Sequence, residues 1–136
     1  MFQPASLRGR ALIMDDEELV RNVARKTLTR RGLEVEVAVD ADEACERFAA
    51  AQRRGCPFQV VILDLTIPGG GGGREALQQL LRLDPAVKAI VCSGYSNAPV
   101  FAEFRSHGFF GRVRKPFHPE ELVAAVRSAL DEGHAG

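Results

Sequence analysis

Five short apolar segments alternate with segments of helical periodicity, and this alternation limits the fold more than any other feature. The third segment, Val60 to Leu63, has four consecutive aliphatic residues, a length typical of a strand buried on both faces. The last helical segment repeats apolar residues at a spacing near 3.6, as at Leu122, Val126 and Leu130. Alternating strands and helices favour right-handed crossovers and a parallel sheet covered on both faces. The pattern therefore predicts a single α/β domain of the (βα)5 type.

Turn and capping signals divide the chain further. Asp15 or Asp16 is expected to cap the first helix, and Asp40 with Glu43 has the spacing of a capping box for the second. Pro119 suits the first position of the last helix. Valines alternate with more polar residues over 34–39, which predicts a strand near a sheet edge. The remaining strands are expected at 11–14, 58–63, 89–92 and 109–113, with a weaker helix at 99–107.

Composition argues against several classes of partner. The 136 residues contain 18 Lys and Arg and 18 Asp and Glu, so the formal net charge is zero. A neutral chain is not expected to bind nucleic acid directly or to contact a membrane through bulk charge. Its apolar segments are far shorter than the ~20 residues needed to cross a bilayer. Three cysteines without metal-like spacing are expected to be reduced thiols of a cytoplasmic protein.

Chemically distinctive residues follow four of the five expected strands. Asp15-Asp16 follows the first, Asp64 the third, Ser93 the fourth and Lys115 the fifth. Taken singly, each has an ordinary explanation: Asp15-Asp16 could begin a helix, Ser93 could be a turn residue and Lys115 could be a solvated surface lysine. Because ligands of open α/β sheets bind at the carboxyl ends of the strands, we expect all of them to gather at one edge.

Such a cluster needs a compensating cation. Two carboxylates 4 Å apart repel each other by roughly 4 kcal/mol at an effective dielectric constant near 20. The candidate ligands are all oxygens and no histidine is adjacent, which favours Mg²⁺. A carboxylate beside Mg²⁺ and a lysine is suited to attack a phosphoryl group, because both cations neutralise the phosphoryl oxygens.

These residues resemble a known family. In their order and spacing, Asp15-Asp16, Asp64, Ser93 and Lys115-Pro116 are similar to the receiver domain of two-component response regulators, over about residues 10–130. The resemblance implies a doubly wound, flavodoxin-like parallel sheet with strand order 2-1-3-4-5. It also implies a signalling switch that accepts a phosphoryl group from a sensor histidine kinase or a phosphotransfer protein and catalyses only its own phosphorylation and dephosphorylation.

The resemblance also assigns roles to the metal-binding residues. Asp64 would be the phosphoacceptor. Mg²⁺ would be bound directly by Asp16, by Asp64 and by the backbone carbonyl of Thr66, and mainly through water by Asp15.

Further roles concern the phosphoryl group and its surroundings. Ser93 would be the switch hydroxyl and Lys115 the lysine that contacts the phosphoryl group. The bond before Pro116 is expected to be cis. Tyr95, two residues beyond Ser93, would tune the lifetime of the phosphoryl group.

One position departs from the family pattern. Arg112 stands where receivers place a Tyr or Phe that couples the switch hydroxyl to the binding surface. Since a guanidinium cannot be buried as a phenol ring is, we expect a weaker or different coupling to the last helix.

The expected organisation is an N-terminal extension at 1–9, a receiver domain at 10–130 and a C-terminal tail at 131–136. The segments 68–73 and 92–96 look most like C-terminal receivers of hybrid sensor histidine kinases. The expected oligomeric state is a monomer or a weak dimer.

Two other functions fit these residues less well. A phosphatase of the haloacid-dehalogenase type would need a second Asp where Thr66 stands. A receiver-like binding module that acts without phosphorylation is the alternative, and the complete acidic and lysine set argues against it.

Overall fold

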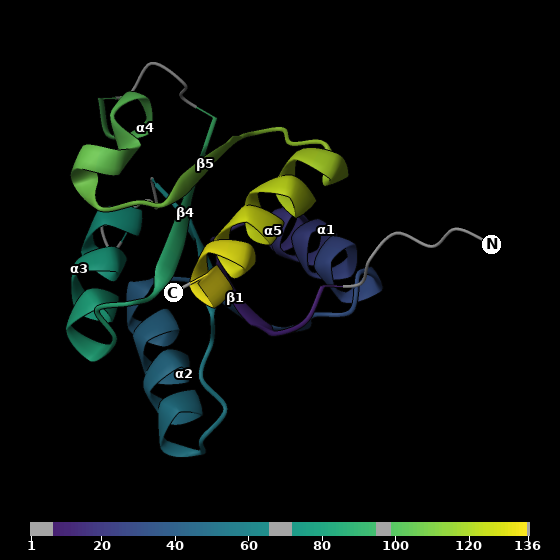
Figure 1. Ribbon diagram of the computed structural model, residues 1–136. Helices are drawn as coiled ribbons and strands as arrows, with labels where there is room; N and C mark the ends of the chain where they lie inside the picture. The colour runs from purple at the N-terminus through teal and green to yellow at the C-terminus, as the bar shows by residue number, and fades with distance from the viewer. Residues whose placement is uncertain (1–6, 66–71, 95–98, 136) are drawn as a thin grey trace.

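The computed structural model describes residues 7–65, 72–94 and 99–135 and confirms the predicted fold. Five parallel strands form one sheet in the order β2-β1-β3-β4-β5, with helices on both faces (Figure 1). The strands are β1 Arg10–Met14, β2 Glu34–Ala38, β3 Val60–Asp64, β4 Lys88–Ser93 and β5 Gly111–Arg114. The helices are α1 Glu18–Arg30, α2 Ala41–Arg53, α3 Gly73–Leu83, α4 Pro99–Ala102, the 3-10 helix η1 Phe104–His107, and α5 Pro119–Ala135.

The core lies in two layers, one on each face of the sheet. Successive side chains of a strand point to opposite faces, so β3 contributes to both layers. Val61 and Leu63 pack with α2 and α3, whereas Val60 and Ile62 pack with α1 and α5. All of β3 is buried, which explains its continuous apolar sequence. The central strand is thereby fixed from both sides, up to its last residue, Asp64.

The edge strand β2 and the start of α2 match their predictions. Glu34 of β2 is exposed, as expected at a sheet edge. The backbone N–H of Glu43 donates to Asp40 Oδ1 at 2.9 Å, and the Glu43 side chain accepts from the N–H of Val39 at 2.8 Å. The capping box is therefore confirmed. The side chain of Glu43 bonds to Val39, the residue before the N-cap Asp40, rather than to Asp40 itself.

Several predicted features differ in the structure, and β3, expected from residue 58, begins at Val60. The N-cap of α1 is Glu17, and it makes no side-chain capping bond, because Asp15 instead accepts the N–H of Glu17. The helix expected at 99–107 divides at Glu103, whose φ of −111° and ψ of 44° are not helical, into α4 and η1. Strand β5 begins at Gly111 rather than Phe109. Phe109 instead ends a turn, because its N–H donates to the backbone oxygen of Phe104.

Both ends of the predicted domain extend further than expected. Leu7 lies within the expected extension, yet it is buried and donates its N–H to Arg31 O at 2.8 Å. The expected tail is helical, since α5 runs to Ala135. Within the described part of the chain, no helix has the length and apolar composition to cross a membrane.

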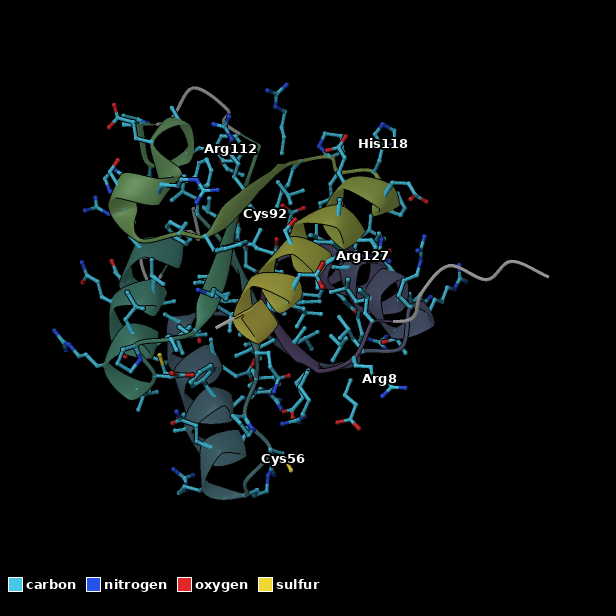
Figure 2. The ribbon with its side chains drawn as sticks, in the orientation of Figure 1. Arg8, Cys56, Cys92, Arg112, His118 and Arg127 are labelled. Carbon is cyan, nitrogen blue, oxygen red and sulfur yellow. The ribbon has the colours of Figure 1, made fainter. Side chains whose placement is uncertain are left out.

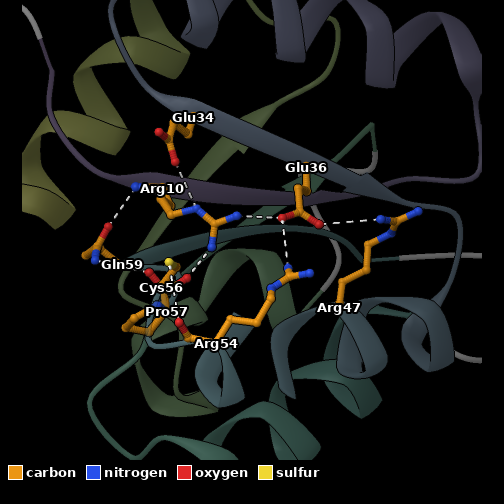
Figure 3. A network of polar contacts seen from close by, with 8 residues as sticks. All are labelled: Arg10, Glu34, Glu36, Arg47, Arg54, Cys56, Pro57 and Gln59. Carbon is orange, nitrogen blue, oxygen red and sulfur yellow. Dashed lines mark hydrogen bonds and ion pairs between the residues drawn. The ribbon is translucent and has the colours of Figure 1, made fainter. Parts of the chain in front are cut away.

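At the amino end of β1, Arg10 joins three segments of the chain (Figure 3). Its guanidinium pairs with Glu34 at 3.1 Å and Glu36 at 2.6 Å, both on β2. It also donates to the backbone oxygen of Cys56 and lies 4.6 Å from the centre of the Phe58 ring. Arg10 thus links β1, β2 and the connection between α2 and β3.

Candidate functional site

The carboxyl ends of the strands bring the predicted polar residues to one edge of the sheet. Asp15 follows β1, Asp64 ends β3 and Ser93 ends β4. All three are buried, with exposed fractions of 2%, 5% and 2% respectively. Sheet register sets their relative height, because Asp64 lies opposite Cys92 and the Lys115 N–H donates to Ser93 O at 2.9 Å. Parallel pairing alone therefore accounts for their convergence.

Lys115 lies between the two buried carboxylates. Its Nζ is 2.6 Å from Asp15 Oδ2 and 3.3 Å from Asp64 Oδ1, and its side chain is 15% exposed. Buried carboxylates are stable when an opposite charge and hydrogen bonds compensate them. One ammonium group supplies both for this pair, so Asp64 is held within reach of a fixed cation.

The electrostatics of the site set Asp64 apart. Burial and the neighbouring negative charge of Asp15 raise the pKa of Asp64 from 3.8 to about 6, although Lys115 opposes the shift. Burial would lower the pKa of Lys115, but its hydrogen bond to Asp15 and the charges of Asp15 and Asp64 raise it above its ordinary value. Near neutral pH the site therefore holds a charged Lys115 beside Asp64, whose ionised form an added cation would stabilise.

The acidic residues after β1 could hold a hard cation. Carboxylate oxygens of Asp15, Asp16 and Glu17 lie within 4.8 Å of one another. Their donors are all oxygen, as Mg²⁺ prefers, and the exposed Asp16 and Glu17 leave room for its water ligands. These residues fit the predicted ion. Glu17 was not predicted as a ligand, although its place in the acidic triplet was a usable signal.

A cleft of about 700 Å³ opens from these residues along α1. Its apolar side includes Leu19, which is 74% exposed, together with Val23 and Phe117. Val23 is exposed on α1, whereas Ala24 and Leu28 of the same helix are buried. The site therefore has a polar floor and an apolar wall that sequence reasoning missed.

Arg112 has an environment that the sequence did not predict. Its guanidinium lies 5.3 Å from the ring centre of Phe101 and 5.1 Å from that of Phe104, and Nη1 donates to Phe101 O at 3.2 Å. Figure 2 labels Arg112 beside α4. The side chain thus fastens α4 and η1 to β5 without being buried.

The Lys115–Pro116 peptide bond is cis, as the resemblance implied. Thr66 and Tyr95 lie outside the described residues.

Comparisons with known proteins agree on one family. The family model for the response regulator receiver domain matches residues 11–127. The chain is 30% identical over 118 residues to the chemotaxis protein CheY of Thermotoga maritima, covering 86% of this chain and 93% of that protein. It is 31% identical over 130 residues to the C4-dicarboxylate transport transcriptional regulatory protein DctD of Pseudomonas aeruginosa, covering 96% of this chain but 27% of that protein. It spans 55% of the response regulator GacA of the same species, at 33% identity over 89% of this chain.

Solved structures extend the likeness to the fold. A CheY-like receiver domain protein of Methanospirillum hungatei superposes with a TM-score of 0.79 at 27% identity, covering 95% of this chain and 98% of that one. A LuxR-family response regulator of Aurantimonas gives 0.80 at 29% identity, covering 93% and 87%.

Proposed function

Because this chain belongs to the response regulator receiver domain family, we propose that it is a phosphoryl-accepting switch with Asp64 as the phosphoacceptor. The observation that carries the proposal is the position of Lys115 Nζ, 3.3 Å from Asp64 Oδ1 and 2.6 Å from Asp15 Oδ2. Asp64 is buried enough to exclude most water, yet it lines the open cleft. The proposed nucleophile, Asp64, therefore lies beside the ammonium group of Lys115 and can be reached through the cleft.

The proposed step is transfer of a phosphoryl group to a carboxylate. An oxygen of Asp64 forms a bond to phosphorus while the bond between phosphorus and the donor's imidazole nitrogen breaks. The electron pair of that bond stays with the leaving imidazole, and Asp64 becomes an acyl phosphate. Lys115 lies where it can neutralise phosphoryl oxygens, and the buried Ser93 hydroxyl is the candidate donor to one of them.

We propose that Asp16, Asp64 and the backbone carbonyl of Thr66 hold Mg²⁺ directly and that Asp15 binds it mainly through water. Glu17, whose carboxylate lies near those of Asp15 and Asp16, would be a further oxygen ligand through water. The ion would supply positive charge beside the transferred group. Asp15 has a second task, since its carboxylate orients Lys115.

The proposed partner is a protein that carries a phosphohistidine, either a sensor histidine kinase or a phosphotransfer protein. The segments 68–73 and 92–96 make the receiver of a hybrid sensor kinase one candidate context. The domain would promote only its own phosphorylation and dephosphorylation.

Incubation with Mg²⁺ and acetyl phosphate, read by intact mass, tests the proposal. We expect a mass gain of one phosphoryl group that Asp64→Asn abolishes and Asp42→Asn retains, because Asp42 is exposed on α2. No gain with either acetyl phosphate or a phosphorylated histidine kinase would favour a binding module that acts without phosphorylation.

A further inference from the structure

The first residue of α3 touches the backbone of the proposed phosphoacceptor. Gly73 is buried, and its N–H donates to Leu65 O at 3.3 Å. A Cβ atom added to Gly73 would lie 2.9 Å from the backbone oxygen of Asp64 and 3.3 Å from Cα of Leu65. Since both neighbours are backbone atoms, any side chain at position 73 would require the strand end or the helix to shift.

Neither side of this contact can move easily. The end of β3 is held by β4, because Asp64 pairs in register with Cys92 and the Leu65 N–H donates to Cys92 O at 2.9 Å. The helix is anchored by the buried residues Ala76, Leu77 and Leu80. Close-packed interiors transmit such displacements rather than absorb them.

Backbone conformation does not explain the glycine. Gly73 is absent from the described glycines with positive φ, so an L-residue could adopt its backbone angles. Helix propensity ranks alanine above glycine. Local propensity therefore favours alanine here, and the close approach to Asp64 is what requires glycine.

We propose that Gly73 is a positioning residue for phosphoryl transfer. The missing side chain lets α3 pack directly against Asp64 and Leu65, which fixes the Asp64 carboxylate relative to Lys115, 3.3 Å away. This inference rests on the proposed function of Asp64. A displacement of a few tenths of an ångström at Asp64 matters, because a misplacement of about 1 Å can slow a reaction roughly 100-fold.

Gly73→Ala tests the inference, with Gly111→Ala as the matched control. A Cβ on Gly111 would meet Ile90 Cγ1 at 3.7 Å, an ordinary contact distance, and Gly111 also has no positive φ. At saturating acetyl phosphate and Mg²⁺, we expect Gly73→Ala to lower the limiting rate of phosphorylation roughly tenfold per folded molecule. Gly111→Ala should stay within about twofold of the wild type, by the same geometric reasoning.

A second measurement separates positioning from loss of folding. Amide NMR shifts of Asp64 and Leu65 should change in folded, metal-free Gly73→Ala and remain unchanged in Gly111→Ala. The inference would be overturned if Gly73→Ala had the limiting rate of the wild type. It would also be overturned if the rate fell only in proportion to the folded fraction while the Asp64 and Leu65 shifts stayed unchanged. Failure of the wild-type protein to accept phosphate would instead defeat the proposed function, and the NMR comparison would still test the contact.

Discussion

Asp64 combines burial with a position between competing charges. Asp15 and burial disfavour its ionised form, whereas Lys115 favours it. Without a metal ion, the ionised Asp64 therefore destabilises the folded state near neutral pH, and an added cation would reduce this destabilisation. This balance couples the stability of the folded protein to the chemistry proposed for the residue.

The stability of the metal-free protein should fall between about pH 4 and pH 6. The pKa of Asp64 rises from 3.8 to about 6 in the folded state, so the unfolded chain ionises first as pH increases. Below about pH 3 both states hold the proton; above about pH 7 both states are ionised and the folded state is destabilised by the full amount. Relative to Asp64→Asn, the wild type should lose about 2 kcal/mol of unfolding free energy between pH 4 and pH 7. Urea denaturation in the presence of a chelator measures the difference.

Asp42→Asn is the control, because this exposed residue is not among the charges that shift the pKa of Asp64 or Lys115. Added Mg²⁺ should restore stability at pH 7 in the wild type but less so in Asp64→Asn. An unchanged difference between wild type and Asp64→Asn across the pH range would contradict the assigned environment of Asp64.

The sequence was informative at single residues where parallel strands impose the geometry. Asp64 ends β3 and Lys115 follows β5, and both strands belong to one parallel sheet, so their convergence is a consequence of the sheet. The environment of Arg112 could not be predicted in this way, because its contacts come from Phe101 and Phe104 across a connection that no periodicity orients. The N-cap of α1 was also not predictable, because the Asp15 side chain accepts the Glu17 N–H and the backbone geometry places Glu17 at the cap.

At the scale of elements, the pair α4 and η1 is the least regular part of the described fold. Each has only four residues, and neither makes the long helical ladder that stabilises α5. Arg112 holds them through two aromatic rings and one backbone oxygen. The single helix predicted at 99–107 failed because burial of Phe101 and Phe109, rather than helical propensity, determines this segment.

Arg112→Ala should loosen α4 and η1. The lost cation–π contacts and hydrogen bond contribute about 1–2 kcal/mol together. Amide hydrogen exchange over residues 99–109 should therefore become roughly tenfold faster. Arg114→Ala is the control, since Arg114 is exposed on the same strand. Equal exchange in the two variants would mean that Arg112 does not fasten this segment.

The start of α2 offers a prediction about capping. Asp40→Ala removes the acceptor for the Glu43 N–H and should lower the free energy of unfolding by about 1 kcal/mol. Asp42→Ala, in the first turn but exposed, should cost only a few tenths of a kcal/mol. Urea denaturation compares the two; equal losses would show that helix-dipole effects outweigh the capping bond.

Across the whole molecule, the two ends of β1 have different tasks. Arg10 at its start links three segments, while Asp15 after its end belongs to the candidate site. Figure 2 places Cys56, whose carbonyl accepts from Arg10, at the opposite end of the view from Arg112. Stability and chemistry should therefore be separable by mutation.

Arg10→Ala should lower the free energy of unfolding by about 2 kcal/mol, because Glu34 loses a partner and Phe58 loses its covering guanidinium. Arg47 and Arg54 still pair with Glu36, which limits the loss. The phosphorylation rate per folded molecule should be unchanged. Arg8→Ala, an exposed position nearby, is the control. A slower rate in folded Arg10→Ala would show that the two ends are coupled.

The two outer strands of the sheet have a consequence for how copies of the chain meet. β2 presents Glu34 and Glu36, and the four-residue β5 presents Arg112 and Arg114. Unpaired strand edges are templates for aggregation, and charged side chains on short edges oppose it. Like charges directly opposite each other also destabilise strand pairs. Two copies that met through the same edge would bring like charges together, so pairing of β2 with β2, or of β5 with β5, is disfavoured between copies of the chain.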